Sequence, residues 1–184
     1  AHGQARSRAA DRRMMVASVS ILRGDLTQQD VDAIVNAANE RMLGGGGVDG
    51  AIHRAAGPRL LEACREVPEL RPGVRCPTGQ ARITPGFQLH ARYVIHTVGP
   101  IYSARSADAE LLGSAFRSAL TLAVEHQLRS IAFPAISCGV YGSPAGEAAQ
   151  VARLVLEERS SCLDDIRFVL FSEDVFDAWR AALG

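Results

Sequence analysis

Two polar side chains and a run of glycines lie within one short stretch of the chain and could bind and hydrolyse a phosphate-containing ligand. Asn39 ends the segment 36–39 (NAAN), and Asp49 follows the four glycines at 44–47. Successive glycines have no Cβ, accept positive φ and can turn several backbone N–H groups toward one anion. Asn39 could bind a hydroxyl or a water, and Asp49 could orient or activate a water. The stretch therefore predicts a phosphate-binding loop beside a water-activating carboxylate.

Each of these features also has an ordinary structural interpretation. An Asn often closes its own turn, and an Asp is favoured in the first turn of a helix by the helix dipole. A glycine run can be a flexible linker, but linkers carry Ser, Pro or charged residues, whereas apolar residues flank this run at 33–35 and 51–52. We therefore favour a binding loop and leave both roles open for Asn39 and Asp49.

A second glycine loop lies at 137–142 (SCGVYG), directly after another apolar segment. Its backbone could form a second anion site, so that the two loops together could hold the two phosphates of a diphosphate. Tyr141 could pack on a ribose or cover the core. Cys138 is conceivable as a nucleophile in such a loop, but no His partner for it is evident in the sequence.

Other candidate residues lie outside the two loops. Asp25 could accept a hydrogen bond from an exocyclic amine or cap a turn. Phe171, at the end of the last predicted strand, could stack on a base, although core packing is the more common role of such residues. His53 could share a helical face with Asp49, but a structural histidine is the more common case. His90 and His96 have no metal-ligand spacing with a Cys or carboxylate, so the sequence predicts no metal site.

Apolar segments of two periodicities are expected to position these loops. Strands are predicted at 15–21, 33–35, 92–98, 131–136 and 166–171. Helices are predicted at 48–56, 58–67, 109–126, 144–158 and 172–183. Strands that alternate with helices indicate an α/β/α layered domain, in which ligands bind at the carboxyl ends of the strands. The loops at 24–27, 36–50 and 137–142 each follow a strand, and we expect them to converge there.

Composition excludes several other classes of protein. The length of 184 residues fits one globular unit, and a formal net charge of zero with 47% hydrophobic residues excludes a disordered chain or a broadly basic nucleic-acid binder. No apolar run reaches membrane-spanning length. All 20 basic residues are Arg, so neither a Schiff-base lysine nor a Walker lysine is available. The four cysteines lack CxxC pairing, which favours reduced thiols in a cytoplasm.

The motifs resemble the macrodomain family, specifically its MacroD-type branch, in their order and spacing. The resemblance covers about residue 19 to the C-terminus and rests on the segments 24–27 (GDLT), 36–39, 44–50, 93–100 (YVIHTVGP) and 136–142. It implies a three-layer α/β/α macrodomain with a central mixed sheet, spanning residues 14–184. Residues 1–13 are Arg- and Ala-rich without the apolar core of a secretory signal, and we expect a disordered lead there. The expected protein is bacterial, cytoplasmic and monomeric.

The family binds ADP-ribose, and many MacroD-type members remove mono-ADP-ribose from acidic side chains or deacetylate O-acetyl-ADP-ribose. The resemblance implies such a hydrolase, without metal or cofactor, acting on mono-ADP-ribosylated proteins and O-acetyl-ADP-ribose, with no membrane or direct nucleic-acid partner. Asp49, with the substrate's own phosphate, would position the attacking water, and Asn39 would fix the distal ribose. Asp25 would receive the adenine amine, and Phe171 would flank the adenine. The ligand-binding residues implied are Asp25, Leu26, Asn36, Gly45, Gly46, Gly47, Val48, Ser137, Cys138, Gly139, Val140, Tyr141 and Phe171.

Two other functions stay open. A non-catalytic reader module would bind ADP-ribose on proteins without cleaving it, because the same loops serve both tasks. A phosphatase acting on ADP-ribose phosphates would share the pocket. The presence of both Asn39 and Asp49 favours the hydrolase. Cys138 stands where many relatives have Thr, which changes a side chain but leaves the backbone donors of the loop in place.

Overall fold

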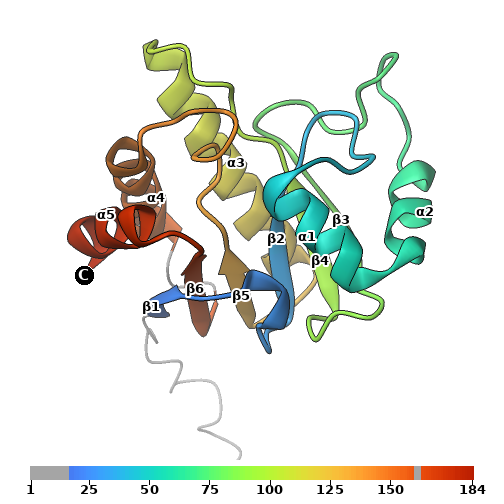
Figure 1. Cartoon of the computed structure of the whole chain (residues 1–184), viewed down its shortest axis with the longest axis horizontal. Coiled ribbons are helices and arrows are strands. Elements are labelled where there is room, and N and C mark those ends of the chain that lie inside the picture. Colours follow the sequence, from blue (N-terminus) through green and yellow to red (C-terminus); the bar gives the residue numbers. More distant parts are fainter. Residues whose placement is uncertain (1–16, 160–162) are drawn as a thin grey trace, which may run out of the picture.

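The computed structural model describes residues 17–159 and 163–184, and a six-stranded sheet of order β1-β6-β5-β2-β4-β3 forms its middle layer (Figure 1). The strands are β1 (Ser18–Arg23), β2 (Ala33–Ala37), β3 (Ala81–Pro85), β4 (Tyr93–Thr97), β5 (Ser130–Phe133) and β6 (Asp165–Leu170). The helices are η1 (Leu26–Gln28), α1 (Gly47–Ala56), α2 (Pro58–Glu66), α3 (Ser106–Glu125), α4 (Ala145–Arg159) and α5 (Glu173–Leu183). The predicted α/β/α fold is confirmed. The lead predicted at 1–13 lies outside the described residues.

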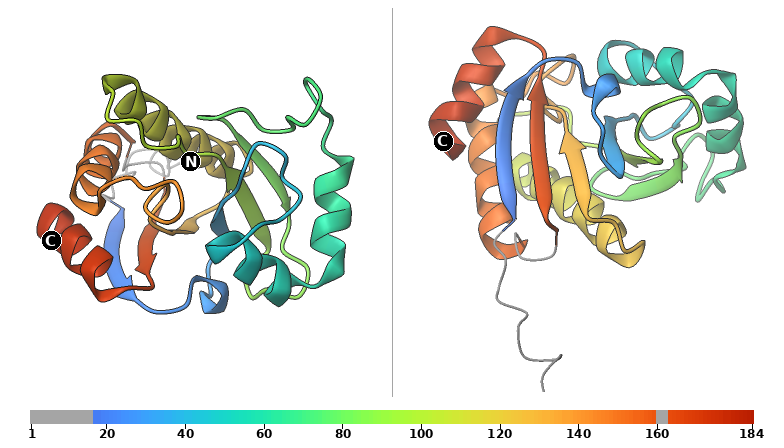
Figure 2. Two further views of the ribbon diagram at one scale, coloured as in Figure 1. Left: turned by 45° about the horizontal axis from the view of Figure 1, so that its top comes forward. Right: turned by 90° about the horizontal axis from the view of Figure 1, so that it is seen from below.

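Helices cover both faces of the sheet because the inner strands are apolar on both sides (Figure 2). Along β2, Ala33 and Val35 belong to the core under α3, α4 and α5, whereas Ile34 belongs to the core under α1 and α2. Side chains alternate between faces along a strand, so Asn36 also points to the α1/α2 face. The same alternation places His96 beside Val94 on that face.

The sheet is mixed, as expected. β1, β6, β5, β2 and β4 run parallel, and β3 pairs antiparallel to β4 at the edge. β3 was not predicted from the sequence, because only Ala81 and Thr84 of its residues are buried and Pro85 ends it. A proline is tolerated at such an edge position. The other predicted strands and helices are present with boundaries shifted by a few residues.

Parallel pairing brings several loops to the same end of the sheet. We define the first loop as residues 38–46, between β2 and α1, and the second loop as residues 134–144, between β5 and α4. β2 and β5 are paired parallel, so both loops leave the carboxyl ends of neighbouring strands. The segment 24–28 and Phe171 follow the carboxyl ends of β1 and β6, which also pair parallel. The expected gathering of these segments at one edge therefore follows from the topology.

The opposite end of the sheet is fixed by Asp32, which precedes β2. Its carboxylate accepts hydrogen bonds from the backbone N–H of Arg129 (2.7 Å) and of Ser130 (3.2 Å) and from the guanidinium of Arg92 (3.1 Å). Burial acts to raise the pKa of Asp32, but these donors outweigh it and the pKa is lowered. Asp32 thus ties together the starts of β2, β4 and β5, which fixes the register of the strands that carry the two loops.

Candidate functional site

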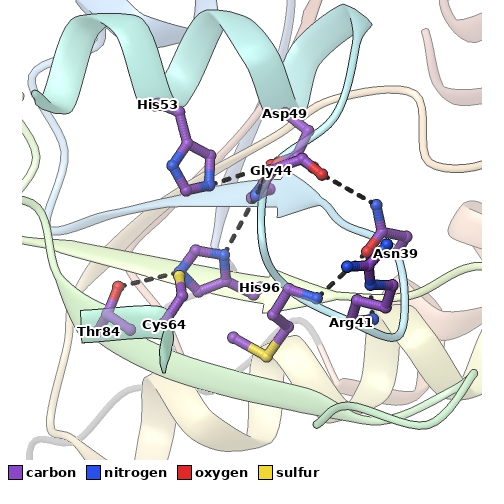
Figure 3. A network of polar contacts seen from close by, with 10 residues as sticks. Asn39, Arg41, Gly44, Asp49, His53, Cys64, Thr84 and His96 are labelled. Atoms are coloured by element: carbon purple, nitrogen blue, oxygen red, sulfur yellow. Dashed lines mark hydrogen bonds and ion pairs between the residues drawn. The ribbon is translucent and has the colours of Figure 1, made fainter. Parts of the chain in front are cut away.

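The first loop is closed by Asn39 (Figure 3). Asn39 Oδ1 accepts hydrogen bonds from the backbone N–H of Arg41 and of Met42, each at 3.2 Å, and Nδ2 donates to the carbonyl oxygen of Gly44 at 3.1 Å. Met42 is buried and has a φ of 60°, a conformation that few non-glycine residues adopt. Asn39 therefore has the turn-closing role that was left open for it, and its amide links residues 41, 42 and 44 of the loop.

Asp49 lies in the first turn of α1 and is only 4% exposed. Its Oδ1 accepts a hydrogen bond from Asn36 Nδ2 at 2.9 Å and lies 3.4 Å from His53 Nε2. Its Oδ2 lies next to Gly45, where a Cβ would be 3.1 Å from Oδ2 and 3.5 Å from Asn39 Nδ2. The two candidate catalytic side chains therefore converge on one glycine, where even a methyl group would crowd the Asp49 carboxylate.

The glycines that follow Gly45 are open toward solvent. A Cβ on Gly46 or on Gly47 would meet nothing within 4 Å, and Gly47 has a φ of 56°. Gly46 is the N-cap of α1, and no side chain caps this helix. Because the first N–H groups of a helix have no partner within it, the start of α1 offers donors and a positive dipole end to an anion, with Val48 half-buried beside them.

The second loop is held by its own backbone. The N–H of Ser143 donates to Ser137 O (2.8 Å), and the N–H of Gly142 donates to Gly139 O (3.0 Å). Ser137 is buried with a φ of 65°, and its hydroxyl donates to Pro100 O (2.9 Å). A Cβ at Gly99 would lie 2.1 Å from Ser137 Oγ, so only glycine fits there.

The residues at the tip of the second loop point in different directions. Val140 is 95% exposed and Gly139 is also exposed. The carbonyl oxygen of Tyr141 accepts a hydrogen bond from the N–H of Tyr102 (2.8 Å), so the loop is tied to the segment after β4. The thiol of Cys138 packs against the core instead, and the N–H of Cys138 donates to Ala135 O (3.1 Å). The outward surface of this loop therefore consists of the backbone at Gly139 and Val140 together with the exposed side chain of Val140.

Cys138 does not have the properties of a nucleophile. Burial raises the pKa of its thiol to about 12, so the thiol is protonated at neutral pH. Burial likewise raises the pKa of Cys64 to about 12 and that of Cys76 to about 11. The fourth cysteine, Cys162, lies outside the described residues.

The residues expected at the adenine end lie on neighbouring strand ends. Asp25 caps η1, where its Oδ1 accepts hydrogen bonds from Thr27 N (2.9 Å) and Thr27 Oγ1 (2.7 Å). Leu26 is buried and packs against the core under α1. Phe171 is 88% exposed, so it does not take the core role that is more common for such residues. Gly24 N donates to Leu170 O (3.0 Å), which brings the segments of Asp25 and Phe171 together.

His96 also contributes to the site, which was not predicted from the sequence. This histidine is fully buried on β4, with Nδ1 at 3.1 Å from Asn36 Nδ2 and Nε2 at 2.9 Å from Thr84 Oγ1 (Figure 3). Burial, the largest effect, lowers the pKa of His96 to about 4, against the opposing effect of Asp49. The available signal was a large polar residue next to the apolar run of each strand: Asn36 after 33–35 in β2 and His96 after 94–95 in β4.

The described residues offer three further observations. Within 17–159 and 163–184, no group of three or more His, Cys, Asp or Glu side chains could hold a metal ion. Over the same residues, no helix is long and apolar enough to cross a membrane. A cavity of about 450 Å³ lies between the N-terminal turns of α3 and α4; it touches the second loop at Ser143, but Asn39, Asp49 and the glycines of the first loop do not line it.

Comparison with known proteins gives one consistent result. The model of the Macro domain family matches residues 35–152. A Macro domain-containing protein of Vibrio parahaemolyticus is 54% identical over 166 residues, covering 90% of this chain and 97% of the relative. One from Xanthomonas campestris is 53% identical over 171 residues, covering 90% and 94%.

Solved structures show the same similarity. An Oceanobacillus iheyensis macrodomain with ADP superposes with a TM-score of 0.85 at 45% identity, covering 92% of each chain. A Trypanosoma brucei macrodomain in complex with ADP-ribose superposes with a TM-score of 0.80 at 43% identity, covering 94% of this chain and 72% of the other. At these identities the likeness extends beyond the general layered architecture.

Proposed function

The chain belongs to the Macro domain family, and on that premise we propose that it is a MacroD-type hydrolase that removes mono-ADP-ribose from acidic side chains of modified proteins and deacetylates O-acetyl-ADP-ribose. The observation that carries this proposal is the convergence of Asn39 and Asp49 on Gly45. A buried carboxylate and an amide beside an open glycine backbone can orient a water and a ribose together. Binding alone needs only the backbone donors.

The proposed ligand position follows from the loops. The uncapped start of α1 and the outward backbone of Gly139 and Val140 supply donors for the two phosphates. Relatives of known structure were solved with ADP and with ADP-ribose, which supports a ligand that carries a diphosphate. At the other end of the ligand, Asp25 receives the adenine amine and the exposed ring of Phe171 stacks on the base.

In the proposed reaction, Asp49 and a phosphate oxygen of the substrate orient a water toward the ester-linked carbon of the distal ribose. The water oxygen forms a bond to this carbon while the bond from the carbon to the ester oxygen breaks, and the carboxylate leaves with the bonding electrons. The proton of the water passes to Asp49 or to the phosphate. Asn39 holds the ribose. An ester is already activated, so orientation in a closed site supplies much of the rate.

The test measures release of ADP-ribose from an automodified, glutamate-linked protein by wild type and by Asp49→Ala. We expect Asp49→Ala to lower turnover about 100-fold or more, because a positioned acid or base contributes about that factor. Calorimetry should give an affinity for free ADP-ribose within about threefold of wild type, because the phosphate donors are backbone groups. Asp174→Ala is the matched control, since Asp174 also lies in the first turn of a helix, but in α5.

The outcomes separate the candidate functions. Equal loss of binding and turnover in Asp49→Ala would remove the catalytic role of Asp49. Wild-type binding without release would make the chain a reader of ADP-ribose. Release of inorganic phosphate from an ADP-ribose phosphate, with none of the ester activities, would identify a phosphatase.

A further inference from the structure

A chain of buried polar side chains runs behind Asp49 across three neighbouring strands. Asn36 on β2 and His96 on β4 are register partners and are both fully buried, and Thr84 on β3 is 5% exposed. The three lie on the face covered by α1 and α2, among apolar residues. Burying polar groups in such a place is unfavourable unless they are hydrogen-bonded, so their arrangement requires a reason.

The amide of Asn36 has one orientation that its neighbours allow. Its nitrogen lies 2.9 Å from Asp49 Oδ1 and 3.1 Å from His96 Nδ1. An amide nitrogen only donates, so both neighbours must accept. If the amide were turned over, its oxygen would face the carboxylate oxygen of Asp49, with no hydrogen between two acceptors. The position of each hydrogen on Asn36 is therefore set by Asp49 on one side and by His96 on the other.

The same logic fixes the proton on His96. Because Nδ1 accepts from Asn36, the ring proton lies on Nε2, which donates to Thr84 Oγ1 at 2.9 Å. Cys64 Sγ lies 3.8 Å from the same nitrogen. A second proton on the ring would place an N–H against the Asn36 amide hydrogens. His96 therefore holds Asn36 in this orientation only while the ring is neutral.

The carbonyl oxygen of Asn36 provides a second, independent observation. Asn36 Oδ1 is buried and has no hydrogen-bond partner within the described part of the chain. An unsatisfied buried acceptor destabilises the fold. Both donors of the amide are used toward Asp49 and His96 while its own acceptor stays unpaired. The amide is thus held by its two donors, on Asp49 and on His96, and by no protein donor to its oxygen among the described residues.

We propose that His96 is a positioning residue for the hydrolysis: through Asn36 it holds Asp49 Oδ1 inside the protein, so that Oδ2 stays beside Gly45 at the reacting end of the ligand. This inference rests on the proposed function. His96 does not touch the substrate and transfers no proton. Its effect should therefore fall on turnover rather than on affinity for ADP-ribose.

Three variants test the proposal. His96→Leu removes the acceptor that faces Asn36. His96→Asn keeps an acceptor oxygen at the place of Nδ1, and Thr84→Val removes the partner of Nε2 without touching Asn36. Release of ADP-ribose is measured at equal concentrations of folded protein, with kcat and KM determined separately and the affinity for ADP-ribose measured by calorimetry.

We expect His96→Leu to lower kcat about tenfold, because a small misplacement of a catalytic group has effects of this order, with KM and affinity within about threefold of wild type. His96→Asn and Thr84→Val should both keep kcat within about threefold of wild type. If His96→Asn were no more active than His96→Leu, or if Thr84→Val lost as much activity, His96 would have a structural role only. Wild-type turnover with an unaffected His96→Leu would overturn this inference and leave the proposed function standing, whereas a wild type without turnover would overturn the proposed function.

A spectroscopic readout does not depend on activity or on the folding of His96→Leu. Nitrogen-15 NMR of wild type should show His96 protonated at Nε2 and unprotonated at Nδ1 from about pH 8 to about pH 5. In Asp49→Ala the side-chain amide resonances of Asn36 should shift, since one of their acceptors is removed. A proton on Nδ1, or unshifted Asn36 resonances, would overturn the proposed chain.

Discussion

The first loop is held mainly by side chains, with one backbone turn from Met42 N to Asn39 O (3.1 Å), whereas the second loop is held mainly by its own backbone. Asn39 alone makes three hydrogen bonds across the first loop, and Asp49 is fixed from behind by Asn36. In the second loop the backbone closes successive turns, and Ser137 adds a single side-chain bond to Pro100. Both loops can present backbone donors to a phosphate. Only the first also carries polar side chains at the point where a reaction could occur.

This difference indicates that phosphate binding depends on backbone groups, whereas the proposed reaction depends on side chains. A loop closed by backbone hydrogen bonds keeps its shape when its side chains change, so an exposed Val140 and a core-facing Cys138 are both tolerated. A loop closed by side chains loses shape and chemistry together when one of them is replaced. The first loop should therefore be the more sensitive of the two to substitution.

The largest expected effect comes from a charge in the first loop. Gly46→Glu should fold normally, since a Cβ there meets nothing within 4 Å, but it places a carboxylate against the proposed diphosphate. Like-charge contact of this kind costs about 4 kcal/mol, or about 1,000-fold in affinity for ADP-ribose by calorimetry. Gly46→Gln is the neutral control and should retain most of the binding. Equal affinities of the two variants would remove the diphosphate from this loop.

Acid should lower the stability of the fold by protonating His96, which lies behind the first loop. The folded-state pKa of His96 is lowered to about 4, below the ordinary value of 6.5, so its contribution is present above about pH 6.5 and is lost as pH falls toward 4. The full loss amounts to about 3 kcal/mol in the free energy of unfolding, and about 2 kcal/mol of it falls between about pH 7 and about pH 4.5. Urea unfolding at about pH 7 and about pH 4.5 measures it.

The matched control for the acid experiment is His96→Asn, which has no titrating ring. Asp32, whose folded pKa is also lowered, contributes acid sensitivity of the same sign to both proteins and cancels in the difference. An equally steep loss of stability in His96→Asn would contradict a buried neutral His96. The second loop itself contains no histidine, so acid has no corresponding ring to protonate there.

Removing one side chain from each loop compares the two loops directly. Asn39→Ala loses three hydrogen bonds and leaves Met42 strained, so we expect about 2 kcal/mol of destabilisation and a clear loss of turnover. Ser137→Ala loses one hydrogen bond and should cost about 1 kcal/mol, with ADP-ribose affinity within about threefold of wild type. Urea unfolding and calorimetry check both. A larger effect of Ser137→Ala would reverse the comparison.

The smallest expected effect is that of Cys138→Thr. The N–H of this residue is already bonded to Ala135 O and its side chain faces the core, so ADP-ribose affinity should stay within about twofold of wild type. Calorimetry provides the measurement. A large loss of affinity would mean that side chains of the second loop contact the ligand.

Local patterns in the sequence predict most of the fold and part of the site. The helix predicted at 109–126 is α3 (Ser106–Glu125), because its apolar spacing is regular over five turns. The edge strand β3 lacks such a pattern and was missed. Asn39 and Asp49 are near each other in sequence, so it was predictable that the first loop and the start of α1 would bring them together. Asn36 and His96 are brought together by the register of two parallel strands, which no local pattern encodes.

The pairing of β1 also determines when folding of the sheet can be completed. In the sheet of the described residues β1 lies at the edge and pairs only with β6, the last strand of the chain. Contacts between such distant segments form slowly, because a long loop must close before they contribute. During synthesis β1 leaves the ribosome before the other five strands but gains its partner only after β6 has emerged. The Asp25 turn follows β1 directly, so the adenine end of the proposed cleft becomes ordered only in the final stage of folding.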